Sequence, residues 1–346
     1  MEHKGRRTAQ YYFELGIREL DAGNIHKAIL ALKSAIRANP QDSRPLINLG
    51  IAYELSGEYK KAQKAYESAL KIDPHNSSAL SSLAGLTLRD GKPQEAFLLY
   101  DSAISINPLY VEPYLNLARM FMEACEFTSA EVYVRKVLAT EPDNTEALNF
   151  LGVITNSTNR AEEAVEHFQE ALRYDANQSS ILSNLGTALR NIDDKKRAVI
   201  AFEKASELSP ENVTVINNLG VLYHEIGEYE KAEVLFKHAI ELQPENPFPF
   251  LNRAELFISL GDYKKALVNL KQYIALVPLD LDTLFKTCGI ARMANQLSDV
   301  VEEMRSFIEE AQPTDTRVAM VTTWLKRVEE NIPILEESEK INPRGD

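Results

Sequence analysis

Prolines recur along this chain at an interval of 34 residues, or at twice that interval. A fixed period of this length predicts an array of stacked repeats, because each repeat can bury its apolar face only against its neighbours. With proline taken as position 32, nine repeats fit, and Ala176 occupies the interior position where a proline is missing. The repeats span 9–42, 43–76, 77–110, 111–144, 145–178, 179–212, 213–246, 247–280 and 281–314.

Two columns of the repeat carry small residues and a third carries large ones. Position 8 is glycine or alanine in the first eight repeats, and position 20 is alanine in the same eight, from Ala28 to Ala266. Position 24 carries a large side chain such as Tyr66 or Phe168. Small residues let two helices approach closely, and the large ones fill the space left between them. These columns predict two packed helices in every repeat.

Residues that end helices mark the limits of both predicted helices. Position 15 is glycine in five repeats and asparagine in two. Both residue types adopt the left-handed backbone conformation at little cost, which predicts the end of the first helix at this position. The proline at position 32 ends the second helix, because proline lacks an N–H and clashes with the preceding turn. Each repeat is therefore predicted to be a helix–turn–helix unit.

The turn between the helices is repeated almost verbatim in two distant repeats, as Gly57-Glu-Tyr-Lys-Lys-Ala62 and Gly227-Glu-Tyr-Glu-Lys-Ala232. With the columns above, it makes the sequence resemble the tetratricopeptide repeat family over 306 of its 346 residues. The resemblance implies an all-α fold: a right-handed α-solenoid superhelix of about nine 34-residue helix–turn–helix repeats, closed by a C-terminal capping helix.

Four segments follow from this register. Residues 1–8 are predicted to be an N-terminal extension, and residues 9–314 the nine repeats. Apolar residues from Val318 to Ile332 fall on one helical face, which predicts a capping helix over 315–332 that covers the last repeat. Residues 333–346 carry prolines and alternating charges and are predicted to be a flexible tail.

Asparagine recurs at position 6, in the first helix of the repeat. In the family this helix lines the concave side, where the resemblance points to positions 2, 5, 6, 9, 12 and 13. An amide matches both the N–H and the C=O of an extended peptide, whatever the side chains of that peptide are. The column resembles the asparagine ladder of the O-linked N-acetylglucosamine transferase repeats, which holds peptide backbones. By position, the ladder would comprise Asn116, Asn184, Asn218 and Asn252, with Asn149 and Asn217 beside it at position 5 and Asn48 apart from it.

An alternative interpretation of the asparagines remains open, since Asn-Leu-Gly and Asn-Leu-Ala are also common consensus sequences of stable repeats. Other residues at groove positions extend the predicted binding surface. Arg119, Arg190 and His224 lie at positions 9 and 12 of the middle repeats. Phe248 and Phe285, with Leu251, would form an apolar contact near the end of the array, unless they pack against neighbouring repeats.

One specific binding mode of the family is excluded by the sequence. Chaperone-binding members hold a terminal carboxylate with lysine at position 5 and asparagine at position 9 of one repeat, helped by later repeats. Charge-assisted hydrogen bonds make such a clamp effective. Here position 5 contains no lysine and position 9 no asparagine. Binding of acidic chaperone tails in that mode is therefore not expected.

Composition limits the classes of partner. The chain has 38 Lys plus Arg against 51 Asp plus Glu, a net charge of −13. Nucleic acids and anionic membranes need a large positive field, so neither is expected to bind. No window approaches 18 uninterrupted apolar residues, so no membrane span is predicted. The charged start of the chain predicts a cytoplasmic protein, or a periplasmic or membrane-anchored one if a leader was removed.

Nothing in the sequence predicts catalysis, and no catalytic residue, metal site or cofactor is expected. The six histidines have no metal-ligand spacing, and Cys125 and Cys288 lie far apart. Outside the repeats only about forty residues remain, too few for a catalytic domain.

The sequence therefore predicts a non-catalytic scaffold or adaptor that binds an extended peptide or a partner protein of unknown identity in its concave groove. Two alternatives stay open. The first is a self-associating structural protein that forms homodimers, and the second is a non-catalytic specificity subunit of a separate enzyme.

Overall fold

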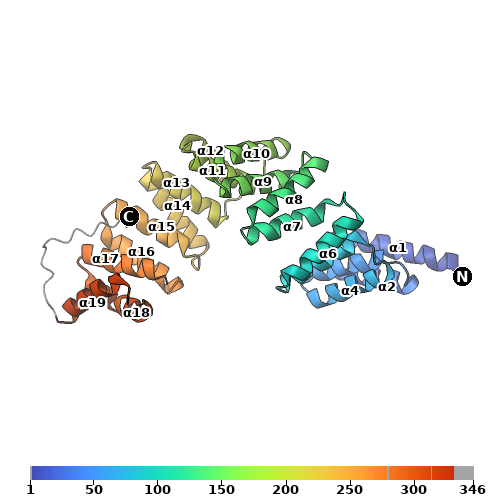
Figure 1. The fold of residues 1–346 in the computed structure, drawn as a ribbon, viewed down its shortest axis with the longest axis horizontal. Coiled ribbons are helices and arrows are strands. Elements are labelled where there is room, and N and C mark those ends of the chain that lie inside the picture. Colours follow the sequence, from blue (N-terminus) through green and yellow to red (C-terminus); the bar gives the residue numbers. More distant parts are fainter. Residues whose placement is uncertain (1, 279, 313, 331–346) are drawn as a thin grey trace. The chain divides into compact units, whose positions relative to one another are not determined.

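The computed structural model describes residues 2–278, 280–312 and 314–330, with side chains from residue 7 onward. Within these ranges the chain forms nineteen α-helices, one short 3₁₀-helix and no β-strand (Figure 1). The predicted all-α, helical-repeat class is confirmed. The chain divides into two compact units, Met1–Asp175 and Ala176–Asp346, called here the N-terminal unit and the C-terminal unit.

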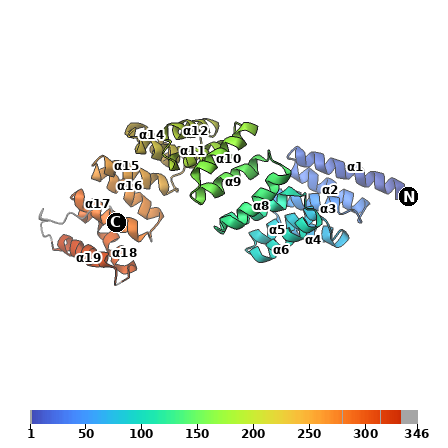
Figure 2. The same cartoon turned by 45° about the horizontal axis from the view of Figure 1, so that its top comes forward.

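The N-terminal unit contains ten helices, of which α1 is the longest with 20 residues, and each packs on the next one along the chain (Figure 2). First helices of consecutive repeats also touch, as α5 touches α7 and α7 touches α9. The bounds are α1 (Glu2–Asp21), α2 (Ile25–Ala38), α3 (Arg44–Leu55), α4 (Tyr59–Ile72), α5 (Ser77–Arg89), α6 (Pro93–Ile106), α7 (Val111–Glu123), α8 (Phe127–Thr140), α9 (Thr145–Ser157) and α10 (Ala161–Tyr174).

The C-terminal unit continues the same pattern with nine further α-helices. Here α11 touches α13, and α13 touches α15. The bounds are α11 (Ser179–Asn191), α12 (Lys195–Leu208), α13 (Val213–Glu225), α14 (Tyr229–Leu242), α15 (Phe248–Ser259), α16 (Tyr263–Leu276), α17 (Leu281–Met293), the 3₁₀-helix η1 (Leu297–Val300), α18 (Val301–Glu310) and α19 (Thr316–Glu329).

The turn between the two helices of a repeat has a left-handed residue at position 15, as the glycine and asparagine column predicts. Five of these residues are glycines with φ between 72° and 83°. The other four have φ between 56° and 60° although they carry side chains: Cys125, Asn159, Asp193 and Asn295. This confirms where the sequence ends the first helix of each repeat.

The core of each unit lies between the two helices of a repeat. The position-20 alanines are fully buried, and the large position-24 side chains such as Tyr66, Phe168 and Phe202 are buried against them. The small residue at position 8 makes room for that large side chain. At Gly50, an added Cβ would lie only 2.3 Å from Cε1 of Tyr66. Burying each large side chain contributes about 1.5–3 kcal/mol.

The last repeat departs from this pattern, because η1 and α18 replace a single second helix. Helix α19 then packs on α17 and α18, next to them in both views (Figures 1 and 2). Its Val321 and Trp324 are buried. The predicted capping helix, 315–332, corresponds to α19 at Thr316–Glu329. The end of that prediction and the predicted tail, 333–346, lie outside the described residues, and α1 begins at Glu2, within the predicted extension.

None of the described helices is long and apolar enough to cross a lipid bilayer.

Candidate functional site

A cleft of about 710 Å³ opens in the N-terminal unit along the first helices of repeats 2, 3 and 4, namely α3, α5 and α7. Nearly all of its lining residues occupy positions 2, 5, 6, 9, 12 and 13 of their repeats, the positions that the family resemblance assigns to the groove. The exceptions are Met120 and two tyrosines from second helices. The cleft is therefore a product of the repeat register, built from equivalent positions of three neighbouring repeats.

Small residues on α5 give the cleft its depth. Ser78, Ser81, Ser82 and Gly85 occupy positions 2, 5, 6 and 9 of repeat 3, where larger side chains would fill the space. A Cβ added to Gly85 would meet only the hydroxyl of Tyr100, at 3.5 Å. The helix is thus able to accept a side chain at Gly85, and the space beside that residue is open.

Two buried tyrosines contribute hydroxyl groups to the cleft. Tyr66 and Tyr100 occupy position 24 of repeats 2 and 3 and are 0% and 2% exposed. The Tyr66 hydroxyl donates a hydrogen bond to Oε1 of Glu54. Burial raises the pKa of both phenols, to about 12 for Tyr100, so both stay protonated at neutral pH. Repeats 5, 6 and 7 have phenylalanine at this position, so their cores offer no such hydroxyl.

Three carboxylates line the cleft: Glu54, Glu112 and Glu123. Burial raises the pKa of Glu54, and the negative charge of Glu112 raises it further, while the bond from Tyr66 and the charge of Arg89 act in the opposite direction. The Tyr110 hydroxyl donates to Oε2 of Glu112 at 2.5 Å. Among side chains that the structure describes, no lysine or arginine forms an ion pair with any of the three carboxylates.

The two arginines of the cleft are held by groups outside its lining. Arg119 donates to Oε1 of Glu146 at 2.8 Å, and its guanidinium lies 5.6 Å from the centre of the Phe150 ring. The guanidinium of Arg89 lies 3.0 Å from the centre of the Tyr59 ring. The lining has three carboxylates against these two arginines, so it carries a net negative charge.

Ser81 is the least satisfied polar side chain of the cleft. It is 2% exposed, it interacts only with the Tyr110 hydroxyl, and its Oγ accepts no hydrogen bond from any described residue. A buried hydroxyl without a partner costs about 1–3 kcal/mol. A ligand that supplies a hydrogen bond to Ser81 would recover part of that cost.

Two of the predicted residues of the N-terminal unit, Asn116 and Arg119, line this cleft. Asn116 lines it and accepts a long hydrogen bond from Arg119, 3.4 Å between Nη1 and Oδ1. The Arg119 guanidinium in turn lies over the ring of Phe150, which occupies position 6 of repeat 5 in place of asparagine. Asn149 lies on α9, is half-buried and has an interaction of its own.

The predicted residues of the C-terminal unit are partly paired with one another. Nδ2 of Asn252 donates to Oδ1 of Asn217 at 2.9 Å, which links α15 to α13. Asn218 and Asn184 are half-buried on α13 and α11, and Asn184 has an interaction of its own. The guanidinium of Arg190 lies 4.0 Å from the carboxylate of Glu225, and Nε2 of His224 lies 3.0 Å from Oγ of Ser259.

The two predicted aromatic contacts are in different surroundings. Phe248 is 60% exposed at the start of α15. Phe285 stacks on Trp324 of α19, with ring centres 5.8 Å apart, and also contacts Phe307. Leu251 packs against the same C-terminal core. Of the two phenylalanines, only Phe248 presents most of its surface to solvent.

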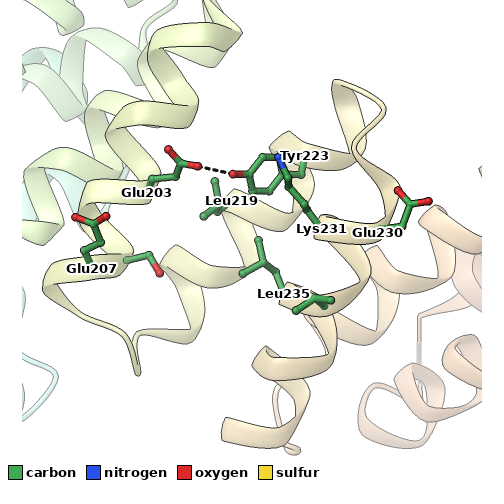
Figure 3. Close-up of a pocket in the computed structure, with 9 residues that line it drawn as sticks. Glu203, Glu207, Leu219, Tyr223, Glu230, Lys231 and Leu235 are labelled. Carbon is green, nitrogen blue, oxygen red and sulfur yellow. Dashed lines mark hydrogen bonds between the residues drawn. The ribbon is translucent and has the colours of Figure 1, made fainter.

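A second hollow, of about 680 Å³, lies in the C-terminal unit between α12, α13 and α14 (Figure 3). Three of its polar side chains have partners among the described residues: Tyr223, Glu203 and Lys231. The Tyr223 hydroxyl donates to Oε1 of Glu203 at 2.5 Å, and the ammonium of Lys231 lies over the Tyr223 ring and 3.4 Å from Glu228. The cleft along α3, α5 and α7 is the better candidate site, because its lining residues come from the groove positions of three successive repeats.

The described residues contain no group of three or more His, Cys, Asp or Glu side chains that could hold a metal ion. Cys125 is exposed at a turn, and Cys288 is buried, which raises the pKa of its thiol to about 12. A buried thiol of this kind is not a nucleophile at neutral pH.

The sequence prediction missed the small residues and carboxylates that shape the cleft, above all Ser81, Glu54 and Glu112. A signal for them was present in the sequence. Repeat 3 carries serine or glycine at four groove positions, and repeats 2 and 3 replace phenylalanine by Tyr66 and Tyr100 at position 24.

The structure consists of helix pairs that recur every 34 residues and pack one after another within each unit. This arrangement defines an α-helical repeat protein of the solenoid class. Models of the tetratricopeptide repeat match residues 19–86, 87–154, 145–178, 179–212 and 213–246. The matches cover more than half of the chain, and the protein belongs to the tetratricopeptide repeat family. Repeats of this family generally mediate protein–protein interactions and scaffolding, and proteins built from them are generally non-catalytic.

Solved structures with the same fold include two distant relatives. A tetratricopeptide repeat protein from Parabacteroides merdae is 18% identical, with a TM-score of 0.56 over 68% of this chain and 93% of that one. A chain of the APC/C hetero-tetramer Cut9–Hcn1 is 20% identical, with a TM-score of 0.61 over 70% of this chain and 47% of that one. This chain thus spans about half the length of the second relative. No curated protein matches the sequence.

Proposed function

We propose that this protein is a non-catalytic interaction scaffold that binds an extended segment of a partner protein in the cleft along α3, α5 and α7. The single observation that carries this proposal is the cleft itself. It is built from the groove positions of three successive repeats, and it is open at Gly85. A chain that crosses three neighbouring helices meets equivalent positions at a regular spacing, which suits an extended peptide better than a compact ligand.

The asparagines extend the proposal beyond the cleft. Asn116 lies within it and has amide hydrogens left after accepting from Arg119. In the C-terminal unit, the bond between Asn252 and Asn217 uses one N–H donor of Asn252 and one acceptor lone pair of Asn217, so each amide keeps three of its four hydrogen-bonding groups. Each therefore keeps capacity for a peptide backbone, and with Asn149, Asn184 and Asn218 they stay candidates for partner binding.

Filling the cleft tests the proposal directly. Gly85→Leu places a side chain in the open space beside α5, where an added Cβ is tolerated. Gly289→Leu is a matched control, because Gly289 occupies the same position 9 in repeat 9 and an added Cβ there meets nothing within 4 Å. Both variants gain helix propensity, so a difference between them reports the cleft and not stability.

The measurement is selection of short random peptides by the purified full-length chain, followed by fluorescence anisotropy with the enriched peptides. The wild type and Gly289→Leu are expected to bind the same peptides with equal affinity, and Gly85→Leu to bind them about tenfold more weakly or not at all. Equal affinity of all three proteins would show that the cleft is not the binding site.

A second candidate function, self-association, is favoured by a separate observation. Position 22, on the second helix, carries an exposed apolar side chain in six repeats, each more than half exposed. Repeats 6, 7 and 8 carry such a side chain in succession, and exposed apolar surface on neighbouring repeats favours contact between proteins. Light scattering over a concentration series tests it, and a mass that stays that of a monomer would exclude it. The six exposed apolar residues at position 22 are Leu30, Leu98 and Val132 in the N-terminal unit, and Ile200, Val234 and Val268 in the C-terminal unit.

A further inference from the structure

The cleft along α3, α5 and α7 has an excess of hydrogen-bond acceptors with negative charge. Glu54, Glu112 and Glu123 line it without an ion pair to any described cation, while Arg119 is bound to Glu146 and Arg89 lies on the Tyr59 ring. An anionic ligand would face repulsion here. A neutral ligand would exclude water from the carboxylates without replacing the lost hydration.

Ser81 provides a second, independent indication of a ligand. This hydroxyl is 98% buried in a helix that lines the cleft. It interacts with the Tyr110 hydroxyl, whose proton is already donated to Glu112, and its own oxygen accepts no hydrogen bond from any described residue. Native proteins rarely leave a buried hydroxyl unsatisfied, so such a group calls for an explanation. A donor entering the cleft would satisfy it.

The walls of the cleft suit a long aliphatic stem. Ile51 and Leu55 of α3, Leu88 of α5 and Met120 of α7 line it together with the polar groups. Lysine and arginine bury their methylene stems along apolar surface and keep the charged head among polar groups. Their heads carry three or five hydrogen-bond donors and no acceptor, which complements carboxylate and hydroxyl oxygens.

The geometry points to a recognition pocket for one basic side chain, a lysine or arginine of the bound partner segment, with its head between Glu54 and Glu112 and its stem against Leu88 and Met120. This inference rests on the proposed function, because it assigns a specificity to the same cleft. It makes the partner segment basic at one defined position, in agreement with the net charge of −13.

The electrostatics of Glu54 agree with this assignment. Its pKa is raised by burial and then by Glu112, while Tyr66 and Arg89 oppose the shift only in part. The ionised carboxylate is therefore poorly compensated in the free protein. A cation bound beside it supplies the missing compensation and favours the ionised form.

The test uses the full-length chain and a library of short random peptides. The expected result is that selected peptides share a lysine or arginine at one position, and that replacing this residue by norleucine weakens binding about tenfold or more. Glu54→Gln with Glu112→Gln removes both charges without changing side-chain size. It should weaken binding of the basic peptide by a similar factor, and should leave binding of the norleucine peptide almost unchanged.

A matched control separates pocket recognition from general charge attraction. Glu162→Gln with Glu166→Gln removes the same two charges from exposed positions of α10, and its affinity for the basic peptide should equal that of the wild type. Peptides that bind in the cleft with no basic preference, or equal affinity of the norleucine peptide, would overturn the inference and leave the proposed function standing. If no peptide binds the wild type, the proposed function fails and the inference fails with it.

Discussion

The side-chain amide of Asn252 donates a hydrogen bond to the side-chain oxygen of Asn217 across 2.9 Å. The two residues occupy positions 6 and 5 of consecutive repeats, so the bond joins the first helices α13 and α15. An asparagine in the predicted ladder thus has a structural role between repeats in addition to any role in peptide binding. Such a bond explains why asparagine is accepted in the interior of a helix, where its intrinsic propensity is low.

The bond between these two asparagines predicts a measurable coupling. Asn217→Ala and Asn252→Ala should each lower the local free energy of unfolding of α13 and α15 by about 0.5–1.5 kcal/mol. The double variant should lose less than the sum of the two, because either change alone already breaks the bond. Repeat arrays open unit by unit, so amide hydrogen exchange of these two helices is the appropriate measurement.

Asn218 provides the control for that cycle. It is adjacent to Asn217 on α13 and takes no part in the bond to Asn252. The decreases in the free energy of unfolding caused by Asn218→Ala and by Asn252→Ala should therefore be additive. If the losses of Asn217→Ala and Asn252→Ala also proved additive, the bond would contribute nothing to stability in solution.

The repeat period was sufficient to predict the helix pairs, the left-handed turns and the small-against-large packing of the core, because each depends on residues within one repeat. The cleft could not be predicted in the same way. It combines position 12 of repeat 2, Glu54, with position 5 of repeat 3, Ser81, and position 2 of repeat 4, Glu112. The depth of the cleft depends on the side chains of all three repeats together, and no single position of the repeat predicts it.

Phe285 illustrates a second limit. Its position 5 assigned it to the groove, but α19 packs against the last repeat and Trp324 stacks on its ring. The register of a repeat does not indicate whether a neighbouring helix covers the same face. A terminal repeat is therefore the place where position-based prediction is weakest.

The close contact between position 8 and position 24 predicts a rescue experiment. At Gly152, an added Cβ would lie 2.5 Å from Cε1 of Phe168, so Gly152→Ala should destabilise α9 and α10 by about 1–3 kcal/mol. Repeats 4 and 8 combine alanine at position 8 with an aliphatic residue at position 24, as Ala118 with Val134. Adding Phe168→Leu to Gly152→Ala should therefore restore part of the lost stability in urea unfolding.

Gly85→Ala is the control variant that tests whether a steric clash causes the destabilisation by Gly152→Ala. Its Cβ would lie at an ordinary contact distance of 3.5 Å from the Tyr100 hydroxyl, so this variant should gain about 0.5–1 kcal/mol from helix propensity. The steric explanation predicts opposite signs for Gly85→Ala and Gly152→Ala. A double variant no more stable than Gly152→Ala alone would argue against it.

The left-handed turns predict stability changes of opposite sign for two substitutions at position 15. Cys125 has φ 58° and is exposed, so Cys125→Gly should raise stability by about 1 kcal/mol through relief of backbone strain. Gly91 has φ 76° with nothing within 4 Å of an added Cβ, so Gly91→Ala should lower stability by a similar amount for the same reason. Thermal unfolding of both variants checks the prediction, which requires shifts of the melting temperature in opposite directions.

Glu54 predicts a dependence of stability on pH. Because its pKa in the folded chain lies above the ordinary value of 4.5, the folded state binds the proton more tightly than the unfolded state does. The favourable contribution of Glu54 is therefore complete below the ordinary pKa and is lost as pH rises through the raised one. The side chains that face Glu54 are Tyr66 on α4, Arg89 on α5 and Glu112 on α7.

Glu54→Gln removes this titration and keeps an oxygen to accept the Tyr66 hydrogen bond. The variant should be more stable than the wild type at neutral pH, and the difference should shrink as pH falls toward 4.5. Urea unfolding at a series of pH values measures it, with the exposed Glu162→Gln as the control that shows no such trend. A stability difference that stayed constant or grew toward acid pH would mean that the Glu54 carboxylate is not destabilised by its surroundings. In that case the cleft would have no uncompensated charge at Glu54 for a basic side chain to neutralise.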